Sequence, residues 1–278
     1  MEINRRGGEK MKRIIAVVLA AFLLLTCVGC AGKEKSDEQP VERIGIISAM
    51  DNEVALLLDE AEIDHVDTIG GVKFNVGTLH GQDVVIMRSG IGKVMSASAI
   101  TAMLNQYKIS KVIFTGVAGG VGDETQVLDE VIATRLIQHD YGFMTNDGFL
   151  WATAVPGEEE GEKDYVDCDP DLVDLAYKSA VEVMGEEHVF KGVIVSGDQF
   201  VASEEYVKTL QDKFDAIACE MEGAGVAAIC KNYKVPIVVI RAMSDKADGN
   251  AHESMENMGD IAADNCNKIV LKMLDGMN

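Results

Sequence analysis

Short apolar runs alternate along the chain with stretches in which apolar residues recur every three or four positions. The runs end in small residues, and they predict buried strands at residues 43–48, 111–115, 131–137, 189–196, 216–219 and 235–242. The amphipathic stretches between them predict helices at residues 51–60, 93–107, 170–184, 203–214, 222–233 and 254–274. Two further segments, 72–79 and 83–88, flank His80 and Gly81 and predict a hairpin. Together they predict a single α/β domain, with a mixed, mainly parallel sheet flanked by helices on both faces.

Residues 138–168 interrupt this alternation. The segment is rich in glycine, aspartate and glutamate, and it shows no sustained periodicity. We predict an irregular functional loop or insertion there.

The first forty residues do not share the pattern of the domain. Lys12 and Arg13 precede an apolar run, residues 14–25, whose length is typical of a signal peptide and short for a membrane span. Met11 is an alternative start, and a short buried helix is the alternative interpretation of the run. Residues 32–40 are charged, lack apolar side chains and end in a proline, which is typical of a flexible tether.

Cys30 lies between Gly29 and Ala31, and this segment resembles the lipobox of a bacterial lipoprotein, although Cys27 stands where leucine is usual. The resemblance implies that the chain is cut before Cys30 and that the cysteine carries a lipid. The expected organisation is a signal peptide at residues 1–29, a lipidated cysteine and tether at residues 30–40, and a folded domain at residues 41–278. The protein would then be anchored to the cell membrane by its lipid and would face outside the cytoplasm.

The charge of the chain excludes one class of partner. With 46 acidic and 25 basic residues, the formal net charge is −21. A surface this acidic argues against nucleic-acid binding and against attraction to anionic lipid headgroups, so a lipid would have to do the anchoring.

Four cysteines belong to the domain, and their spacing matches no zinc-binding pattern. They are Cys168, Cys219, Cys230 and Cys266. The apolar context of two of them favours free thiols in the core, with a disulfide as the alternative.

Polar or glycine-rich segments follow six of the predicted strands. They are residues 48–53, 89–93, 115–120, 196–200, 220–222 and 244–245. The carboxyl ends of parallel strands meet at one edge of a sheet, so these segments predict a composite ligand site. Asp245 is the most informative of these residues, because an aspartate at a strand end could protonate a leaving group. The ordinary alternative is a Ser-Asp pair that caps a helix.

The motifs AMxxEV, SGIGK, TGxAGG, SGDxF, EMEGAG and RAMSDxAD occur in this order between about residues 44 and 274. This ordered set resembles the 5′-methylthioadenosine/S-adenosylhomocysteine nucleosidase family of the nucleoside phosphorylase superfamily. The resemblance implies a nucleoside phosphorylase-like fold and hydrolysis of the N-glycosidic bond between adenine and ribose. It also implies a homodimer, a small nucleoside substrate, and no metal or organic cofactor.

The resemblance also implies how the catalytic work is divided. Asp245 would protonate or hydrogen-bond N7 of adenine, with Ser244 orienting it, and Glu53 would activate the attacking water. Arg241 would position Glu220 or the water network. Taken singly, Glu53 is a typical first-turn helix carboxylate and Arg241 a typical structural ion pair; the ordered motifs favour the catalytic interpretation.

Further residues would bind the substrate. Glu222 would accept hydrogen bonds from the two ribose hydroxyls, and Phe200 would stack on the purine. The other residues implied in binding are Met50, Ala118, Gly119, Val201, Glu220, Met221 and Met255. Of these, the methionines suit the thioether end because their side chains are soft and flexible.

Some positions depart from the family pattern. Val117 stands where some members carry a serine, and Met255 stands where some carry an aromatic residue. Residues 138–149 differ from the usual loop, from which the neighbouring subunit supplies apolar residues to the 5′ pocket. Tyr141, Phe143 and Phe149 are the candidates for that contribution.

Two other functions remain open on the sequence. A nucleoside phosphorylase would need a phosphate site. The carboxylate of Glu53, in the loop after the first strand, would repel phosphate, whereas Arg88 could attract it and leaves this function possible. A lipid-anchored nucleoside-binding protein would need no acid and base on opposite sides of a glycosidic bond.

Overall fold

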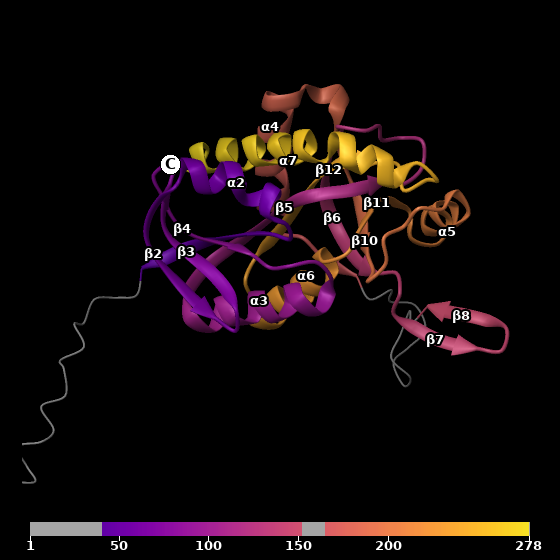
Figure 1. The fold of residues 1–278 in the computed structure, drawn as a ribbon, viewed down its shortest axis with the longest axis horizontal. Helices are drawn as coiled ribbons and strands as arrows, with labels where there is room; N and C mark the ends of the chain where they lie inside the picture. Colours follow the sequence, from indigo (N-terminus) through magenta and orange to yellow (C-terminus); the bar gives the residue numbers. More distant parts are fainter. Residues whose placement is uncertain (1–40, 152–164, 278) are drawn as a thin grey trace, which may run out of the picture. The chain divides into compact units, whose positions relative to one another are not determined.

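The computed structural model of the protein describes residues 41–151 and 165–277 (Figure 1). The predicted signal peptide, Cys30 and the tether lie outside the described residues, and so does the part of the predicted loop at residues 152–164. The strands are β1 (Glu42–Ser48), β2 (Glu62–Ile69), β3 (Val72–Leu79), β4 (Gln82–Arg88), β5 (Lys108–Gly120), β6 (Glu130–Gln138), β7 (Gly142–Thr145), β8 (Gly148–Trp151), β9 (Val166–Asp167), β10 (Val189–Ser196), β11 (Ala216–Glu220) and β12 (Ile237–Asp245). The helices are α2 (Asp51–Glu60), α3 (Lys93–Gln106), α4 (Pro170–Met184), α5 (Glu204–Phe214), α6 (Gly223–Tyr233) and α7 (Ala251–Asp275), with a short 3-10 turn, η1 (Glu186–His188).

One mixed sheet organises the domain. Its strand order is β11-β10-β6-β12-β5-β1-β4-β3-β2, with β9 on β6. Parallel pairings join β4, β1, β5 and β12 in sequence and also join β6, β10 and β11, while β2, β3 and β4 are antiparallel. β11 pairs with β5 as well as with β10, so the strands β11, β10, β6, β12 and β5 close into a ring. The predicted α/β fold with a mixed sheet is confirmed, with more antiparallel pairing than the sequence indicated.

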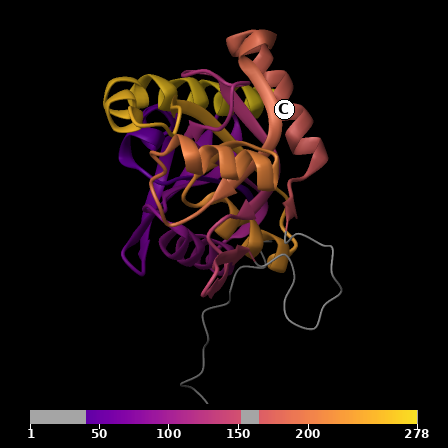
Figure 2. The same ribbon diagram turned by 90° about the vertical axis from the view of Figure 1, so that its right-hand side faces the viewer.

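Helices cover the sheet on two sides. α2, α4 and α7 lie together on one side, and α3 packs against α6 on the other (Figures 1 and 2). α7 runs along β12 and β5, the two central strands. With both faces covered, the central strands must be apolar on both faces, as their sequences are.

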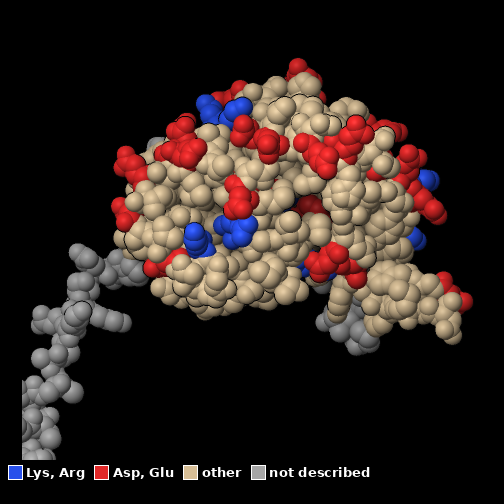
Figure 3. All heavy atoms as spheres, viewed as in Figure 1, with Lys and Arg blue, Asp and Glu red and all other residues tan. Residues whose placement is uncertain are grey.

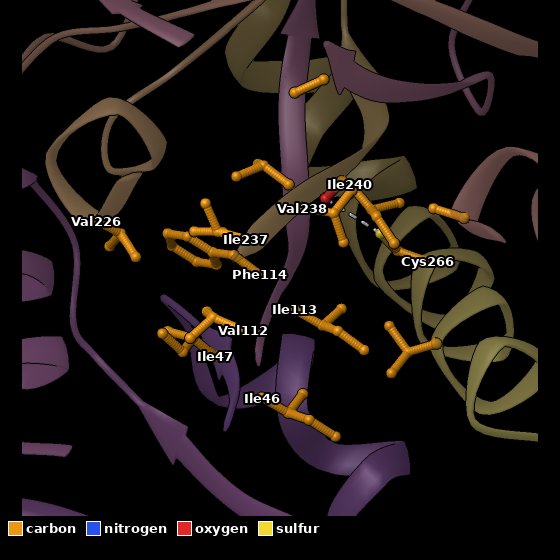
Figure 4. Packing of buried hydrophobic residues seen from close by; sticks show 14 of the residues in the cluster. Ile46, Ile47, Val112, Ile113, Phe114, Val226, Ile237, Val238, Ile240 and Cys266 are labelled. Carbon is orange, nitrogen blue, oxygen red and sulfur yellow. Dashed lines mark hydrogen bonds between the residues drawn. The ribbon is translucent and has the colours of Figure 1, made fainter. Parts of the chain in front are cut away.

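The core is densest where β12 meets β5 and α7. All nine residues of β12 are buried. Ile240 of β12 and Phe114 of β5 belong to this core, and the Cys266 thiol of α7 lies 3.5 Å from the carbonyl oxygen of Ile240 (Figure 4). Each fully buried side chain of this kind contributes about 1.5–3 kcal/mol. The four cysteines of the domain are free and buried, as the sequence favoured.

Three segments differ from the sequence predictions. β2 was not predicted, because it is an edge strand whose charged side chains hide the alternation expected of a strand. β5 continues to Gly120, so the glycine-rich motif after Thr115 is strand rather than turn. Part of the predicted irregular loop forms the hairpin β7–β8, whose short strands carry too few residues to show a period.

Glu130 is an unusual member of the core. Its side chain is fully buried at the start of β6, and neither carboxyl oxygen has a hydrogen-bond partner within the described residues. Burial raises the pKa of Glu130 well above its ordinary value; the nearby Cys266 thiol offsets part of this rise, and the Asp129 charge adds to it. The folded protein therefore keeps Glu130 protonated.

We expect Glu130→Gln to raise stability at neutral pH. The unfolded chain releases this proton near pH 4.5, whereas the folded chain retains it, so the wild type loses stability as pH rises above that value. The loss is about 1.4 kcal/mol per pH unit until the folded-state pKa is reached. Melting temperatures at pH 7.5 should favour the variant, and the advantage should vanish near pH 4. Glu62→Gln, on the exposed edge of β2, is the control; equal melting of wild type and Glu130→Gln throughout would show an ionised, solvated Glu130.

Candidate active site

An open cavity of about 120 Å³ lies at the carboxyl ends of β1, β5, β10, β11 and β12. It is lined by Ala49, Met50, Glu53, Ile91, Val117, Ala118, Gly119, Gln199, Phe200, Val201, Cys219, Glu220, Met221, Glu222, Ser244, Asp245 and Met255. The location, at the carboxyl ends of the strands, is the one expected of a small-molecule site in an α/β fold.

The cavity brings together nearly all the residues that the sequence singled out. Every predicted catalytic or substrate-binding residue lines it except Arg241. Ile91 and Gln199 also line it; both belong to motifs quoted from the sequence, and that signal could have found them. Cys219 was assigned to the core, and although it is buried, it also forms part of the cavity wall.

Asp245 is the last residue of β12, and its carboxyl group is held at both oxygens. Ser244 Oγ donates to Oδ2 at 2.8 Å, and the amide of Ala247 donates to Oδ1 at 2.7 Å. Burial raises the pKa of Asp245, and these two hydrogen bonds only partly offset the rise. A Cβ on Gly119 would lie 2.9 Å from Asp245 Oδ1, which explains the glycine opposite it. The result is a fixed carboxyl group that holds a proton more readily than an exposed aspartate.

Glu53 is the third residue of α2, and it lines the same cavity. Its Oε2 accepts the amides of Ala49 and Met50 at 2.8 and 2.7 Å, and its Oε1 accepts the amide of Val117 at 2.8 Å. Burial raises the pKa of Glu53, while the Arg241 charge and the three amides lower it. Glu53 is thus both a helix-start carboxylate and a cavity residue.

Arg241 lies behind the cavity wall rather than in it. Its side chain is 1% exposed, and Nη2 donates to Glu220 Oε2 at 2.8 Å. Its guanidinium also lies over the ring of Phe114, 4.2 Å from the centroid. Breaking a buried pair of this kind costs about 3–5 kcal/mol.

Glu220 lines the cavity, but its carboxylate is engaged elsewhere. It accepts from Arg241, from Ser196 Oγ and from the amides of Glu222 and Gly223 at the start of α6. The geometry therefore assigns Glu220 to fixing this wall, whereas the sequence had placed it among the substrate-binding residues.

Glu222 precedes α6 and lies beside Glu220. Its Oε1 accepts the amide of Gly92 at 2.8 Å. Burial, and then the nearby charge of Glu220, raise the pKa of Glu222 to about 8. A carboxyl group held in this way can accept hydrogen bonds from two adjacent hydroxyls.

The remaining wall of the cavity is apolar. Phe200 is 40% exposed, and its ring stacks on His252 of α7 with centroids 4.5 Å apart. Met50, Met221 and Met255 supply flexible side chains around it. An aromatic face beside thioether side chains suits a flat ring carrying an apolar substituent.

Across residues 41–151 and 165–277, no group of three or more His, Cys, Asp or Glu side chains is arranged to hold a metal ion. Within the same residues, no helix is long and apolar enough to cross a membrane.

Comparison with known proteins extends over the whole cavity-bearing domain. A family model described as the phosphorylase superfamily matches residues 43–275. The chain is 39% identical over 236 residues to the 5′-methylthioadenosine/S-adenosylhomocysteine nucleosidase of Bacillus thuringiensis (strain Al Hakam), covering 84% of this chain and 98% of that relative.

Solved structures agree with the sequence relatives. The Helicobacter pylori nucleosidase of the same name, complexed with a pyrrolo[3,2-d]pyrimidine pyrrolidinol, has a TM-score of 0.76 and 35% identity, covering 86% of this chain and 100% of that one. The Neisseria meningitidis nucleosidase in complex with methylthio-immucillin-A has a TM-score of 0.76 and 34% identity, covering 85% and 100%.

Proposed function

The chain belongs to the 5′-methylthioadenosine/S-adenosylhomocysteine nucleosidases of the phosphorylase superfamily, and from this membership we propose how its own residues divide the reaction. The enzyme hydrolyses the N-glycosidic bond of 5′-methylthioadenosine, S-adenosylhomocysteine or a related 5′-modified adenosine and releases adenine. The assignment of an acid and a base rests on one observation: two buried carboxyl groups, Asp245 and Glu53, line the same cavity.

Asp245 is the general acid. Its raised pKa favours the protonated form, which donates to N7 of adenine as the bond between C1′ and N9 breaks. The electron pair of that bond leaves with the purine, and the proton makes the purine a better leaving group. Ser244 fixes the direction of the carboxyl group through its hydrogen bond.

Glu53 is the general base. It takes a proton from the water that attacks C1′, on the side of the sugar away from the purine. Burial raises its pKa, which favours taking up a proton, and the Arg241 charge and the three amide donors offset part of that rise and hold the carboxylate in place. The products are adenine and the free 5′-modified ribose.

The other cavity residues bind the substrate. Glu222 accepts from the ribose hydroxyls, Met221 packs on the sugar, and Phe200 stacks on the purine with its second face already covered by His252. The backbone of Val201 reads the purine edge. Met50 and Met255 contact the 5′ substituent, and Ala118 and Gly119 form the floor of the cavity.

The charges of the cavity favour water over phosphate as the nucleophile. Among its described lining residues are four carboxylic acids and no lysine, arginine or histidine. Arg88 was the residue that left a phosphorylase possible on the sequence. Its Nη1 lies 2.9 Å from Asp51 Oδ2 on the surface, and it does not line the cavity. A phosphate dianion would meet repulsion from Glu53 with no lining cation to offset it.

We expect Asp245→Asn and Glu53→Gln each to lower kcat by roughly 10²- to 10⁴-fold, the usual contribution of a general acid or base. Both variants keep the shape of the side chain, so affinity for the substrate 5′-methylthioadenosine itself should survive within about tenfold. The measurement is adenine release from 5′-methylthioadenosine. A near-normal rate in either variant would refute the role given to that residue.

The same assay separates the three functions. Release should proceed at the same rate with and without inorganic phosphate, and the sugar product should be the free ribose. A strict phosphate requirement with ribose 1-phosphate as product would establish a phosphorylase. Ligand binding with no adenine release by the wild type would establish a binding protein.

The homodimer rests on an apolar surface beside the cavity. Ile91, Val94 and Met95, at the start of α3, are exposed by 54%, 76% and 52%. Tyr141 and Phe143, by the hairpin β7–β8, are exposed by 52% and 47%. Hydrogen bonds from Lys93 to residues 138 and 140 place the two groups side by side. A surface of this kind in a soluble domain marks an interface, and a second copy would bring apolar side chains to the open 5′ end of the cavity.

We expect Val94→Glu to convert the homodimer to a monomer, because it places a charge on this apolar surface. Analytical ultracentrifugation at micromolar concentration is the measurement. Ile261→Glu, at a 48% exposed site on α7, is the matched control and should leave the dimer intact. A wild-type protein that sediments as a monomer would exclude the proposal.

The lipid anchor is supported by the sequence ahead of the domain. The family match begins at residue 43, and the preceding segment carries the lipobox-like Cys30 after an apolar run. Acidic side chains are spread over the face of the domain seen in Figure 3, which would repel anionic lipid headgroups. Attachment outside the cytoplasm would therefore depend on the lipid rather than on surface charge.

We expect Cys30→Ser to move the protein from the membrane fraction to the soluble fraction and to abolish its labelling by radioactive palmitate. Ser36→Ala, in the predicted tether and outside the lipobox-like segment, is the control and should change neither result. Persistence of Cys30→Ser in the membrane after a high-salt wash would show that something other than the Cys30 lipid holds the protein there.

A further inference from the structure

Three charged residues, Lys93, Asp140 and Asp198, take no part in the chemistry described above, and they contact one another. The backbone amide of Lys93 donates to Asp198 Oδ1 at 2.7 Å, and the amide of Asp198 donates to Asp140 Oδ2 at 2.8 Å. Lys93 Nζ in turn donates to Asp140 Oδ1 and, at 2.9 Å, to Gln138 Oε1. The network closes on itself and joins the start of α3, the end of β6 and the loop after β10.

The Lys93–Asp140 pair has the properties of a fixed contact. Each side chain is 15% exposed, so water screens the pair far less than it screens a surface ion pair. Burial raises the pKa of Asp140, but the hydrogen bonds from Lys93 and from the Asp198 amide outweigh it, and the net pKa is lowered. His139, the neighbouring titratable group, lowers it further. Asp140 is therefore ionised throughout the neutral range.

The network lies between two parts of the substrate site. Gly92 and Lys93 are consecutive residues at the start of α3; the amide of Gly92 donates to Glu222, and the amide of Lys93 donates to Asp198. Asp198 lies two residues before Phe200. Glu222, assigned to the ribose, and Asp198, close in sequence to the Phe200 ring assigned to the purine, thus accept hydrogen bonds from two adjacent amides.

The backbone at Gly92 makes this double attachment feasible. Its φ is +94°, a conformation that strongly favours glycine, and a Cβ there would lie 3.0 Å from Asp198 Oδ1. Both acceptors are carboxylates at the N-terminus of a 14-residue helix, where the helix dipole stabilises negative charge.

We propose that Lys93, Asp140 and Asp198 form a clamp that fixes the ribose-binding and purine-binding parts of the site relative to each other. None of the three lines the cavity, so they are positioning residues. The proposal rests on the assignment of Glu222 to ribose and Phe200 to purine in the proposed function. A ligand that spans both parts gains affinity from their fixed spacing, whereas adenine alone occupies one part and does not.

The clamp predicts an unequal loss of affinity. Asp198→Ala and Asp140→Asn should weaken methylthio-immucillin-A at least about tenfold, a change of about 1.4 kcal/mol, and adenine by less than about threefold. Calorimetric titration of both ligands is the measurement. Asp198→Asn keeps an oxygen acceptor for the Lys93 amide and should recover most of the loss. Lys208→Met, which removes an exposed pair with Asp212 on α5, should change neither affinity.

Two outcomes would overturn the clamp. Equal weakening of both ligands would show a general loss of structure at the site, and unchanged affinity for both would show that the contacts do not matter. Melting curves identify a variant that fails to fold; if Asp198→Ala fails, Asp140→Asn still supplies the weakened variant, and Asp198→Asn remains the one expected to bind nearly as the wild type does. Adenine release by the wild type is measured in parallel: an inactive wild type contradicts the proposed function, whereas equal losses in an active enzyme contradict the clamp alone.

Discussion

A single buried cation holds the active site together. Arg241 interacts with Glu53, Glu220 and Glu222; burial alone would lower the pKa of the guanidinium, but the three carboxyl groups outweigh burial and raise it. One positive charge cannot balance three carboxylates away from water, so the cluster must retain protons. The raised pKa values of Glu53 and Glu222 express that imbalance. A site built in this way can both give and accept protons near neutral pH, which is what hydrolysis of an N-glycosidic bond requires.

The sheet topology brings these groups together. Because β11 pairs with β5 as well as β10, the segment after β11 faces the end of β5 across the cavity. Glu220 then anchors both Arg241 and the start of α6, and Glu222 follows two residues later. The cavity walls are rigid strand ends and helix starts, so little of the binding free energy is spent on ordering them.

The sequence predicted the parts of this arrangement that depend on local pattern. Strand ends marked by polar residues placed Asp245 and Glu53 in one site, and the apolar runs placed the core. The sequence could not show that Arg241 lies behind the wall, because a residue at a strand end can face either side of the sheet. It also could not show the contacts among Lys93, Asp140 and Asp198, since each pair is more than forty residues apart and depends on the tertiary fold. β2 was not predicted because it is an edge strand with mostly exposed side chains, so its sequence has little of the alternation of apolar and polar residues that indicates a strand.

The four buried thiols have a chemical consequence for a protein proposed to face outside the cytoplasm. Burial raises the pKa of Cys168, Cys219, Cys230 and Cys266, so each stays a thiol rather than a thiolate. Oxidants and disulfide exchange act on the thiolate, and they also need access to the sulfur. The domain therefore carries its cysteines as small apolar side chains, and its fold is indifferent to whether the surrounding medium is oxidising or reducing.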